Sequence, residues 1–325
     1  MTTVSETGSG GRVGVLGKLS AGQRNRVITT FNLVLMCLPA LVMLIIFNYL
    51  PMFGLVIAFK DYRFAKGIFG SEWVGLNNFR FIFGGAGTGW RVVWHTVTYN
   101  LIFIFSGLVG SLTLAFLVNE VHRSRMSRVY QAMSFLPHFV SWVVVGIFAN
   151  GFLRADGGLI NKFLMSFGMA EPIRFYQSPQ YWPYILAVVN LWKGVGFGSI
   201  TYLAGMLGID DELYEAAAID GANRWQQIWF ITLPLLIPLI ITVTLLSLGG
   251  IFRGNLEMFQ MMVGENALLY STTDIIDTFV FRSLMRLGSL GMASAAGFFQ
   301  SVVGLIMILV TNQVVKSVNR ERALY

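Results

Sequence analysis

The sequence predicts an all-α integral membrane protein with six transmembrane helices, and three observations support this. Only 12% of the 325 residues are charged and 55% are hydrophobic, whereas about 25% of the residues of a soluble globular domain are charged. The mean hydropathy is +0.66. Six stretches also reach the roughly 20 apolar residues that a helix needs to cross the hydrocarbon core of a bilayer. Soluble enzymes, nucleic-acid-binding proteins and disordered proteins are therefore poor matches.

The predicted spans are continuous apolar stretches separated by polar connections. We place them near residues 28–50, 95–118, 130–152, 182–204, 232–252 and 292–315. The third and fourth spans carry His138, Asn150, Asn190 and Lys193, whereas the second and sixth are apolar all round. Because polar groups are costly in hydrocarbon, we expect the third and fourth spans to face protein or a water-filled path.

Residues 1–26 precede the first span and are rich in Ser, Thr and Gly, which predicts a disordered tail. The apolar run from Val27 is too long for the core of a cleavable signal peptide. Part of the tail is similar to a phosphate-binding loop, but Arg12 and Leu19 stand where that motif needs Gly and Ser or Thr. We therefore expect no nucleotide site in this chain.

The distribution of basic residues predicts the orientation of the spans. Basic residues are equally numerous on the two sides, but Arg123, Arg125 and Arg128 crowd the short connection between the second and third spans. Short basic connections stay on the cytoplasmic side. This cluster therefore favours a cytoplasmic location for both termini.

The loop 205–234, between the fourth and fifth spans, contains a predicted short helix. Asp210 is a suitable N-cap, and the alanines that follow Glu215 favour helix propagation. Gly221 provides a residue that can adopt the left-handed conformation at the helix end. The middle of this helix carries only small side chains, so the backbone of another protein could approach it closely. From the residues alone, a pair of amphipathic helices lying on the membrane remains an alternative.

A resemblance to a known family distinguishes these alternatives. The run Glu215-Ala216-Ala217, followed by Gly221 and then by Ile231-Thr232-Leu233-Pro234, resembles the EAA signature of inner-membrane subunits of binding-protein-dependent ABC importers. The resemblance implies the type I ABC importer (MetI-like) permease fold over residues 27–325. It also implies that the loop 205–234 docks into a groove of a cytoplasmic ATPase. The residues implied for this coupling contact are Tyr214, Glu215, Ala216, Ala217, Ala218, Asp220 and Gly221.

Further motifs resemble the branch of these permeases that carries polysaccharides and complex oligosaccharides. They include Phe135-Leu-Pro-His-Phe-Val-Ser-Trp142, Asp156-Gly-Gly158 with Asn161, and Asp274-Ile-Ile-Asp-Thr278. Two departures are Trp94-His95, where that branch usually has Arg-Asn, and Phe197, where Trp is common. The resemblance therefore implies sugar transport, without defining which sugar.

The resemblance also implies the partners of the chain. These are a second permease subunit, two copies of an ATPase subunit that bind ATP and Mg²⁺, an extracytoplasmic solute-binding protein and the lipid bilayer. The implied location is the bacterial cytoplasmic membrane. We expect no catalytic residue, no bound cofactor and no nucleic-acid partner in this chain. We also expect no metal site, because the three histidines are scattered and no metal-binding motif is present.

A sugar path should combine polar groups for the hydroxyls with aromatic faces for the rings. The candidates near the third to fifth spans are Trp142, Asn150, Asn190, Trp192, Lys193, Asn255 and Gln260. The alternatives are structural: any one Trp could belong to an interfacial belt, and Lys193 could hold helix geometry or reach the interface. His138 follows Pro137 and is interpreted as a hydrogen-bonded residue near a helix break.

Two other classes of protein remain to be weighed. An intramembrane enzyme could use Lys193, His138 or a serine, but the sequence has no recognised pairing of nucleophile and base. An ion-driven secondary transporter usually has internal repeats and charged residues in several spans, whereas Lys193 is the one charged residue in the middle of a predicted span. Both alternatives predict activity of the isolated chain without ATP.

Overall fold

The computed structural model describes residues 21–83, 88–121 and 126–318. These residues are helical except for connections and one antiparallel pair of short strands, β1 (Lys60–Asp61) and β2 (Glu72–Trp73). The predicted all-α class is therefore confirmed. The chain divides into two compact units, residues 1–56 and 57–325.

The first unit contains one long helix, α1 (Ala21–Leu44), which continues into a π-helical turn, η2 (Ile45–Tyr49). Helix α1 begins within the predicted tail, so residues 21–26 are helical. Residues 1–20 of that tail, and Arg123 and Arg125 of the basic cluster, lie outside the described residues. A 3₁₀ segment, η3 (Leu50–Phe59), leads into the second unit.

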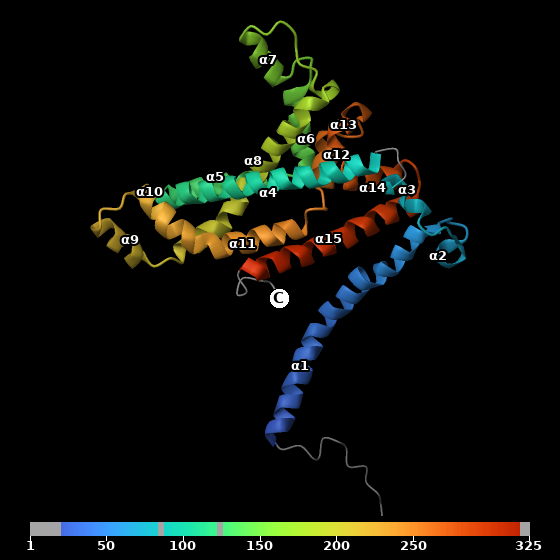
Figure 1. The fold of residues 1–325 in the computed structure, drawn as a ribbon, viewed down its shortest axis with the longest axis horizontal. Helices are drawn as coiled ribbons and strands as arrows, with labels where there is room; N and C mark the ends of the chain where they lie inside the picture. The colour runs from blue at the N-terminus through green and yellow to red at the C-terminus, as the bar shows by residue number, and fades with distance from the viewer. Residues whose placement is uncertain (1–20, 84–87, 122–125, 319–325) are drawn as a thin grey trace, which may run out of the picture. The chain divides into compact units, whose positions relative to one another are not determined.

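The second unit contains four long helices and many short ones (Figure 1). The long helices are α4 (Thr88–Glu120), α8 (Trp182–Leu207), α11 (Leu233–Gly249) and α15 (Leu290–Val318). The shorter helices are α2 (Gly67–Gly70), α3 (Arg80–Phe83), α5 (Ser127–Phe139), α6 (Trp142–Leu153), α7 (Leu159–Ser166), α9 (Asp211–Ile219), α10 (Arg224–Gln227), α12 (Leu256–Met262), α13 (Tyr270–Thr273) and α14 (Ile276–Met285). Short 3₁₀ or π turns are η4 (Asn77–Phe79), η5 (Phe175–Gln177), η6 (Pro179–Tyr181), η7 (Ile228–Thr232) and η8 (Ala267–Leu269).

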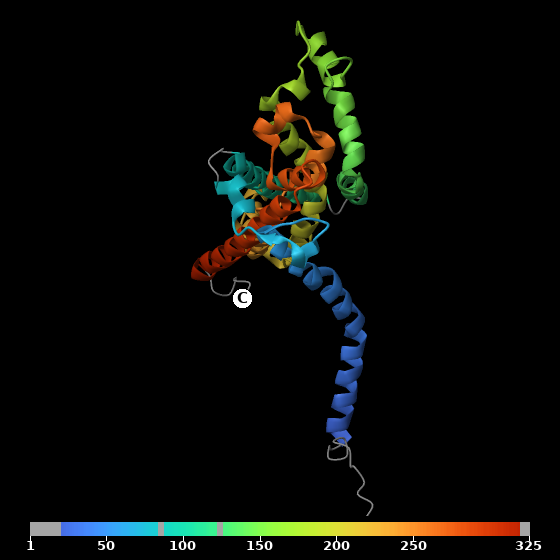
Figure 2. The same cartoon turned by 90° about the vertical axis from the view of Figure 1, so that its right-hand side faces the viewer.

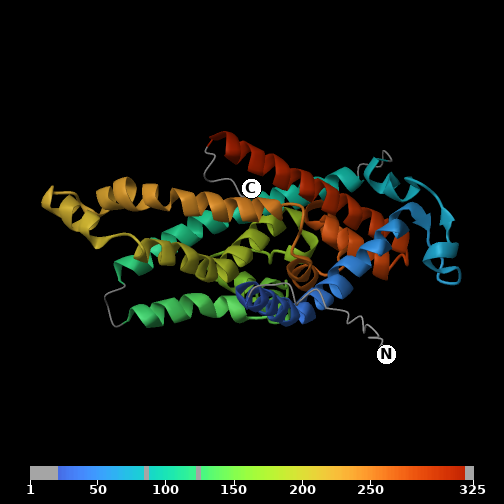
Figure 3. The same ribbon diagram turned by 90° about the horizontal axis from the view of Figure 1, so that it is seen from below.

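The four long helices of this unit form a bundle (Figures 1 and 3). Helix α4 packs along α8, and α11 contacts α4, α8 and α15. Helix α5 packs on α8 where Gly196 faces its backbone, since an added β-carbon would lie 1.7 Å from the carbonyl oxygen of Ser134. Outside the bundle, α12 packs against α6 (Figures 1 and 2), and the buried Trp182 and Phe259 belong to the core between them.

Four of the described helices are long and apolar enough to cross a membrane, or five if a bent pair counts as one span. The four are Asn32–Phe59, Gly89–Glu120, Arg224–Gly249 and Leu290–Lys316. The predicted span 182–204 is a continuous helix, α8, but it is not among them. Its apolar sequence is interrupted by Asn190, Lys193 and the glycines that follow. The mean hydropathy of the segment is lower as a result, because polar side chains and glycine are less hydrophobic than the aliphatic residues around them.

The segment of the predicted span 130–152 is not one straight helix. The structure has two helices, α5 and α6, bent by 90° at Val140 and Ser141. Pro137 cannot donate a backbone hydrogen bond and weakens the end of α5. Val140 is extended, and the Ser141 hydroxyl then accepts a hydrogen bond from the Val144 amide at 3.4 Å, which makes it the N-cap of α6.

Candidate functional site

A polar cavity of about 420 Å³ lies at the break between α5 and α6. Its walls come from the break itself, from the middle of α8 and from the beginning of α12. The lining residues are His138, Phe139, Val140, Ser141, Trp142, Asn190, Lys193, Gly194, Asn255 and Glu257. The broken helix therefore places polar groups and an aromatic ring around one space.

Lys193 holds the end of α5 with its ammonium group. Its Nζ donates to the carbonyl oxygens of His138 at 2.6 Å and Val140 at 2.7 Å, and more weakly to that of Pro137 at 3.5 Å. Carbonyls at a helix C-terminus have no partner within the helix, and a cation there is favourable. An ammonium group has three N–H donors, and the three carbonyl oxygens can take all of them. Lys193 therefore acts on the cavity mainly through its positive charge. Its Nζ also lies 5.2 Å from the Trp142 ring centroid.

Two aromatic rings, those of His138 and Phe197, stack at the same break. The imidazole of His138 stacks on Phe197 of α8, with ring centroids 4.3 Å apart and planes inclined by 9°. Phe197 is one of the two departures from the resembled family. The predicted helix break near His138 is confirmed, and the ring of this residue packs against α8.

Four of the seven predicted path residues line this cavity: Trp142, Asn190, Lys193 and Asn255. The other three do not. Asn150 lies near the other end of α6, Trp192 is 47% exposed, and Gln260 lies farther along α12.

The prediction missed Glu257 and counted His138 as structural. Asn255 is the N-cap of α12, because its Oδ1 accepts from the Met258 amide at 3.0 Å. Glu257 follows in the first turn, where acidic residues are favoured. This capping pattern was the signal in the sequence that could have identified the start of α12 and its acidic residue.

Lys193→Met should lower the free energy of unfolding by about 1–3 kcal/mol, because the carbonyls at the end of α5 lose their donor. Lys193→Arg is the matched control, since it keeps a cation with several donors. The measurement is thermal unfolding in lipid nanodiscs. Equal unfolding temperatures for Lys193→Met and the wild-type protein would contradict this role.

The loop 205–234, for which the resemblance implies a coupling role and which is called the coupling loop below, contains the short helix that the sequence predicts. Asp210 caps α9 by accepting a hydrogen bond from the Glu212 amide at 3.0 Å. Gly221 has φ = 83° and follows the end of α9. Asn223 is then the N-cap of helix α10 and forms a capping box with Gln226. Both ends of α9 therefore follow from local capping signals.

The side chains of α9 divide into two groups. Most of the residues implied for ATPase contact are exposed: Glu215, Ala216, Ala218, Asp220 and Gly221. Tyr214 and Ala217 are half-buried. A cavity of about 490 Å³ lies between α9 and α10, with Asp211 and Glu215 in its lining. An exposed helix with small central residues and adjacent carboxylates can accept a basic partner surface.

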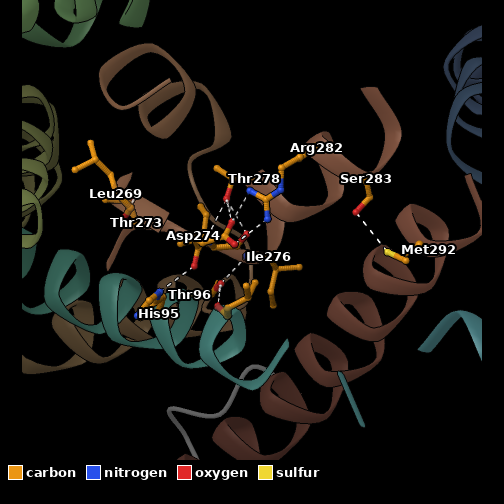
Figure 4. A network of polar contacts seen from close by, with 12 residues as sticks. His95, Thr96, Leu269, Thr273, Asp274, Ile276, Thr278, Arg282, Ser283 and Met292 are labelled. Carbon is orange, nitrogen blue, oxygen red and sulfur yellow. Dashed lines mark hydrogen bonds and ion pairs between the residues drawn. The ribbon is translucent and has the colours of Figure 1, made fainter. Parts of the chain in front are cut away.

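The connection between α11 and α15 carries a buried ion pair (Figure 4). Arg282 donates to both carboxylate oxygens of Asp274, at 3.1 Å and 2.8 Å, and Thr278 adds a third bond at 3.0 Å. Asp274 is 1% exposed. Burial alone would lower the pKa of Arg282, but its bonds to Asp274 outweigh this and raise that pKa. The guanidinium of Arg282 therefore stays charged at physiological pH.

Three residues on α4 hold this connection in place. His95 Nδ1 lies 3.1 Å from the Asp274 carbonyl oxygen, Thr96 Oγ1 accepts from the Ile276 amide at 2.9 Å, and Tyr99 donates to the Thr272 carbonyl at 2.9 Å. Figure 4 shows the first two contacts. His95 belongs to the other departure from the resembled family. Its ring bonds a backbone carbonyl, which an asparagine amide can also do.

Comparisons with known proteins agree with this geometry. The family model described as "Binding-protein-dependent transport system inner membrane component" matches residues 104–320. Protein LplB of Bacillus subtilis (strain 168) is 36% identical over 289 residues, which are 89% of this chain and 90% of that protein. The polygalacturonan/rhamnogalacturonan transport system permease protein YteP of the same strain is 35% identical over 91% of each chain.

Two solved structures of bacterial ABC transporters are also similar to this chain. A chain of a bacterial ABC transporter involved in the import of the acidic polysaccharide alginate has a TM-score of 0.82 and 31% identity. The match covers 91% of this chain and 98% of that one. A bacterial alginate ABC transporter in complex with an alginate pentasaccharide-bound periplasmic protein has a TM-score of 0.81 and 31% identity, over 90% and 97% of the two chains.

Proposed function

The chain belongs to the family of binding-protein-dependent transport system inner membrane components, and on this premise we propose that it forms half of the pore of an oligosaccharide importer. It is a multi-pass permease subunit of the cytoplasmic membrane, and it is not the ATPase. The proposal rests above all on the cavity at the α5–α6 break, where residues of the kind that bind sugars converge.

We infer that the substrate is an oligosaccharide cut from an acidic polysaccharide. YteP is named for polygalacturonan and rhamnogalacturonan, and the similar solved transporter imports alginate. In the cavity, Trp142 offers a ring face, and Asn190 and Asn255 offer amides for hydroxyl groups. The positive charge of Lys193 favours carboxylates, and Glu257 can accept hydrogen bonds from sugar hydroxyls.

We propose six membrane crossings, with both termini on the cytoplasmic side. Besides the four apolar helices, these are the bent pair α5–α6 and helix α8. At 1.5 Å per residue the 26 residues of α8 extend roughly 39 Å, which is enough to cross a bilayer. The hydrogen bonds of Lys193 offset part of the cost of its charge there.

The proposed complex contains a second permease subunit, two ATPase subunits that bind ATP and Mg²⁺, and an extracytoplasmic solute-binding protein. Closure of the ATPase pair displaces α9 of each permease and tilts the spans from an inward-open to an outward-open arrangement. This is coupling between two distant sites through elements that have two arrangements.

Affinity purification in mild detergent tests the assembly. Recovery of an ATPase chain and a second multi-span permease is the expected result, and ATP should drive uptake after reconstitution with the binding protein. An isolated chain that is active without ATP would overturn the proposal in favour of an intramembrane enzyme or an ion-driven transporter.

Trp142→Ala should raise the apparent KM for uptake of an alginate or galacturonate pentasaccharide by about 2- to 10-fold, because one aromatic contact with the ring is lost. Trp192→Ala is the matched control, since Trp192 lies on α8 but does not line the cavity. The measurement is uptake of labelled pentasaccharide into proteoliposomes. Full affinity and full rate in Trp142→Ala would remove this residue from the path.

A further inference from the structure

Tyr214 joins the short helix of the coupling loop to the base of α11. Helix α9 packs only loosely on the other described helices, so its position depends on individual contacts. The Tyr214 side chain is half-buried and its Oη lies 2.9 Å from Thr232 Oγ1. Thr232 is 3% exposed and is the last residue of η7, directly before α11 begins at Leu233.

The Thr232 hydroxyl makes two hydrogen bonds, one to Tyr214 and one to Gln227. Thr232 Oγ1 donates its proton to the carbonyl oxygen of Gln227 at 3.3 Å. A hydroxyl has a single proton, so when Thr232 donates to Gln227, the Tyr214 phenol is the donor to Thr232. The Gln227 side chain is buried and bonds back to the Ala222 carbonyl at 3.5 Å. The chain of bonds therefore runs from α9 through η7 to α10.

The contacted segment is suited to transmit a displacement. Residues 228–232 form a π turn, which leaves one backbone position with irregular pairing and often marks a functional site. Tyr214 and Thr232 also line a small cavity of about 40 Å³ with Phe116 and Glu120 of α4. Arg224 of α10 lies 3.6 Å from Glu120. Tyr214 therefore lies where α4, α9, α10 and the base of α11 meet.

We propose that Tyr214 is a positioning residue that passes the displacement of α9 to α11 through Thr232, in place of the direct ATPase contact implied by the sequence resemblance. The inference rests on the proposed function, because it assumes that an ATPase displaces α9. The exposed residues Glu215, Ala216, Ala218, Asp220 and Gly221 bind the ATPase. The Tyr214 phenol transmits the resulting displacement of α9 to α11. Loss of the phenol hydroxyl leaves the ring packed and the exposed surface unchanged.

Tyr214→Phe tests the link in the reconstituted complex. The expected result is normal recovery of the ATPase chain and an increase of about 2- to 10-fold in ATP hydrolysed per labelled pentasaccharide imported, the effect of losing one hydrogen bond. Thr232→Val should act in the same way and should not add to Tyr214→Phe. Thr232→Ser keeps the hydroxyl, so the ATP hydrolysed per pentasaccharide imported should equal that of the wild-type complex. Tyr184→Phe, on an exposed tyrosine of α8, is the control.

A distance measurement tests the link without transport. Spin labels at Ile219→Cys on α9 and Leu235→Cys on α11, both exposed positions, are introduced after Cys37→Ser. With the wild-type Tyr214, the distance distribution should stay narrow and unchanged when the ATPase is trapped with ATP and vanadate. In Tyr214→Phe it should broaden and shift. Identical distributions with and without the hydroxyl would overturn the link, whereas a wild-type chain that binds no ATPase would overturn the proposed function itself.

Discussion

Asp274→Ala should lower the free energy of unfolding by about 3 kcal/mol, because it leaves the guanidinium of Arg282 without its partner. Removing one member of a buried ion pair costs about 3–5 kcal/mol. The Arg282 side chain is 22% exposed, so solvent screens part of its charge and the loss should fall at the low end of this range. Thermal unfolding in nanodiscs measures the effect.

Two further variants make this result specific. Asp274→Ala with Arg282→Met removes both charges and should recover part of the lost stability. Asp61→Ala breaks the exposed pair between Asp61 and Arg63 and should change stability by about 1 kcal/mol or less. A loss in Asp274→Ala as small as in Asp61→Ala would contradict the structural role of the buried pair.

Gly221→Val should abolish uptake while the spans remain folded. Gly221 has φ = 83°, a conformation that costs an L-residue about 1–2 kcal/mol and a β-branched residue more. The chain beyond α9 would relax to another path and move the exposed surface of α9 away from its ATPase groove. The measurement is ATP-driven uptake by proteoliposomes, together with ATP hydrolysis by the same complexes.

Gly168→Val is the matched control, because Gly168 has φ = 96° in the connection after α7, far along the chain from the coupling loop. It imposes similar backbone strain and should leave coupling intact. Glu215→Gln removes one exposed carboxylate of α9 and should weaken ATPase recovery without changing the fold. Normal uptake by both Gly221→Val and Glu215→Gln would contradict the docking role of the loop.

The boundaries of α9 show how far local signals extend. The Asp210 cap, the following alanines and Gly221 act within one or two turns of chain, so the predicted helix and the observed helix agree. The all-α class follows in the same way, because apolar length and composition act segment by segment. The ATPase contact of the exposed residues remains a prediction, as does the sugar path.

The break between α5 and α6 depends on contacts that are distant along the chain. Pro137 and Ser141 are local signals, but they lie within an apolar run that also fits one straight span. Lys193, 55 residues farther along the chain, stabilises the bent arrangement by donating a hydrogen bond to the His138 carbonyl. The break determines where the cavity lies and allows Glu257 to line it.

The sequence by itself determined the helical class, the membrane location of the chain and both ends of α9, because these depend on apolar length, composition and capping over short distances. Tertiary structure decided the 90° angle of the bend, which candidate residues share a cavity, and the attachment of the segment around Asp274 to α4. The Thr96 hydroxyl and the Ile276 amide are 180 residues apart. Their pairing depends on the packing of whole helices, which no local pattern encodes.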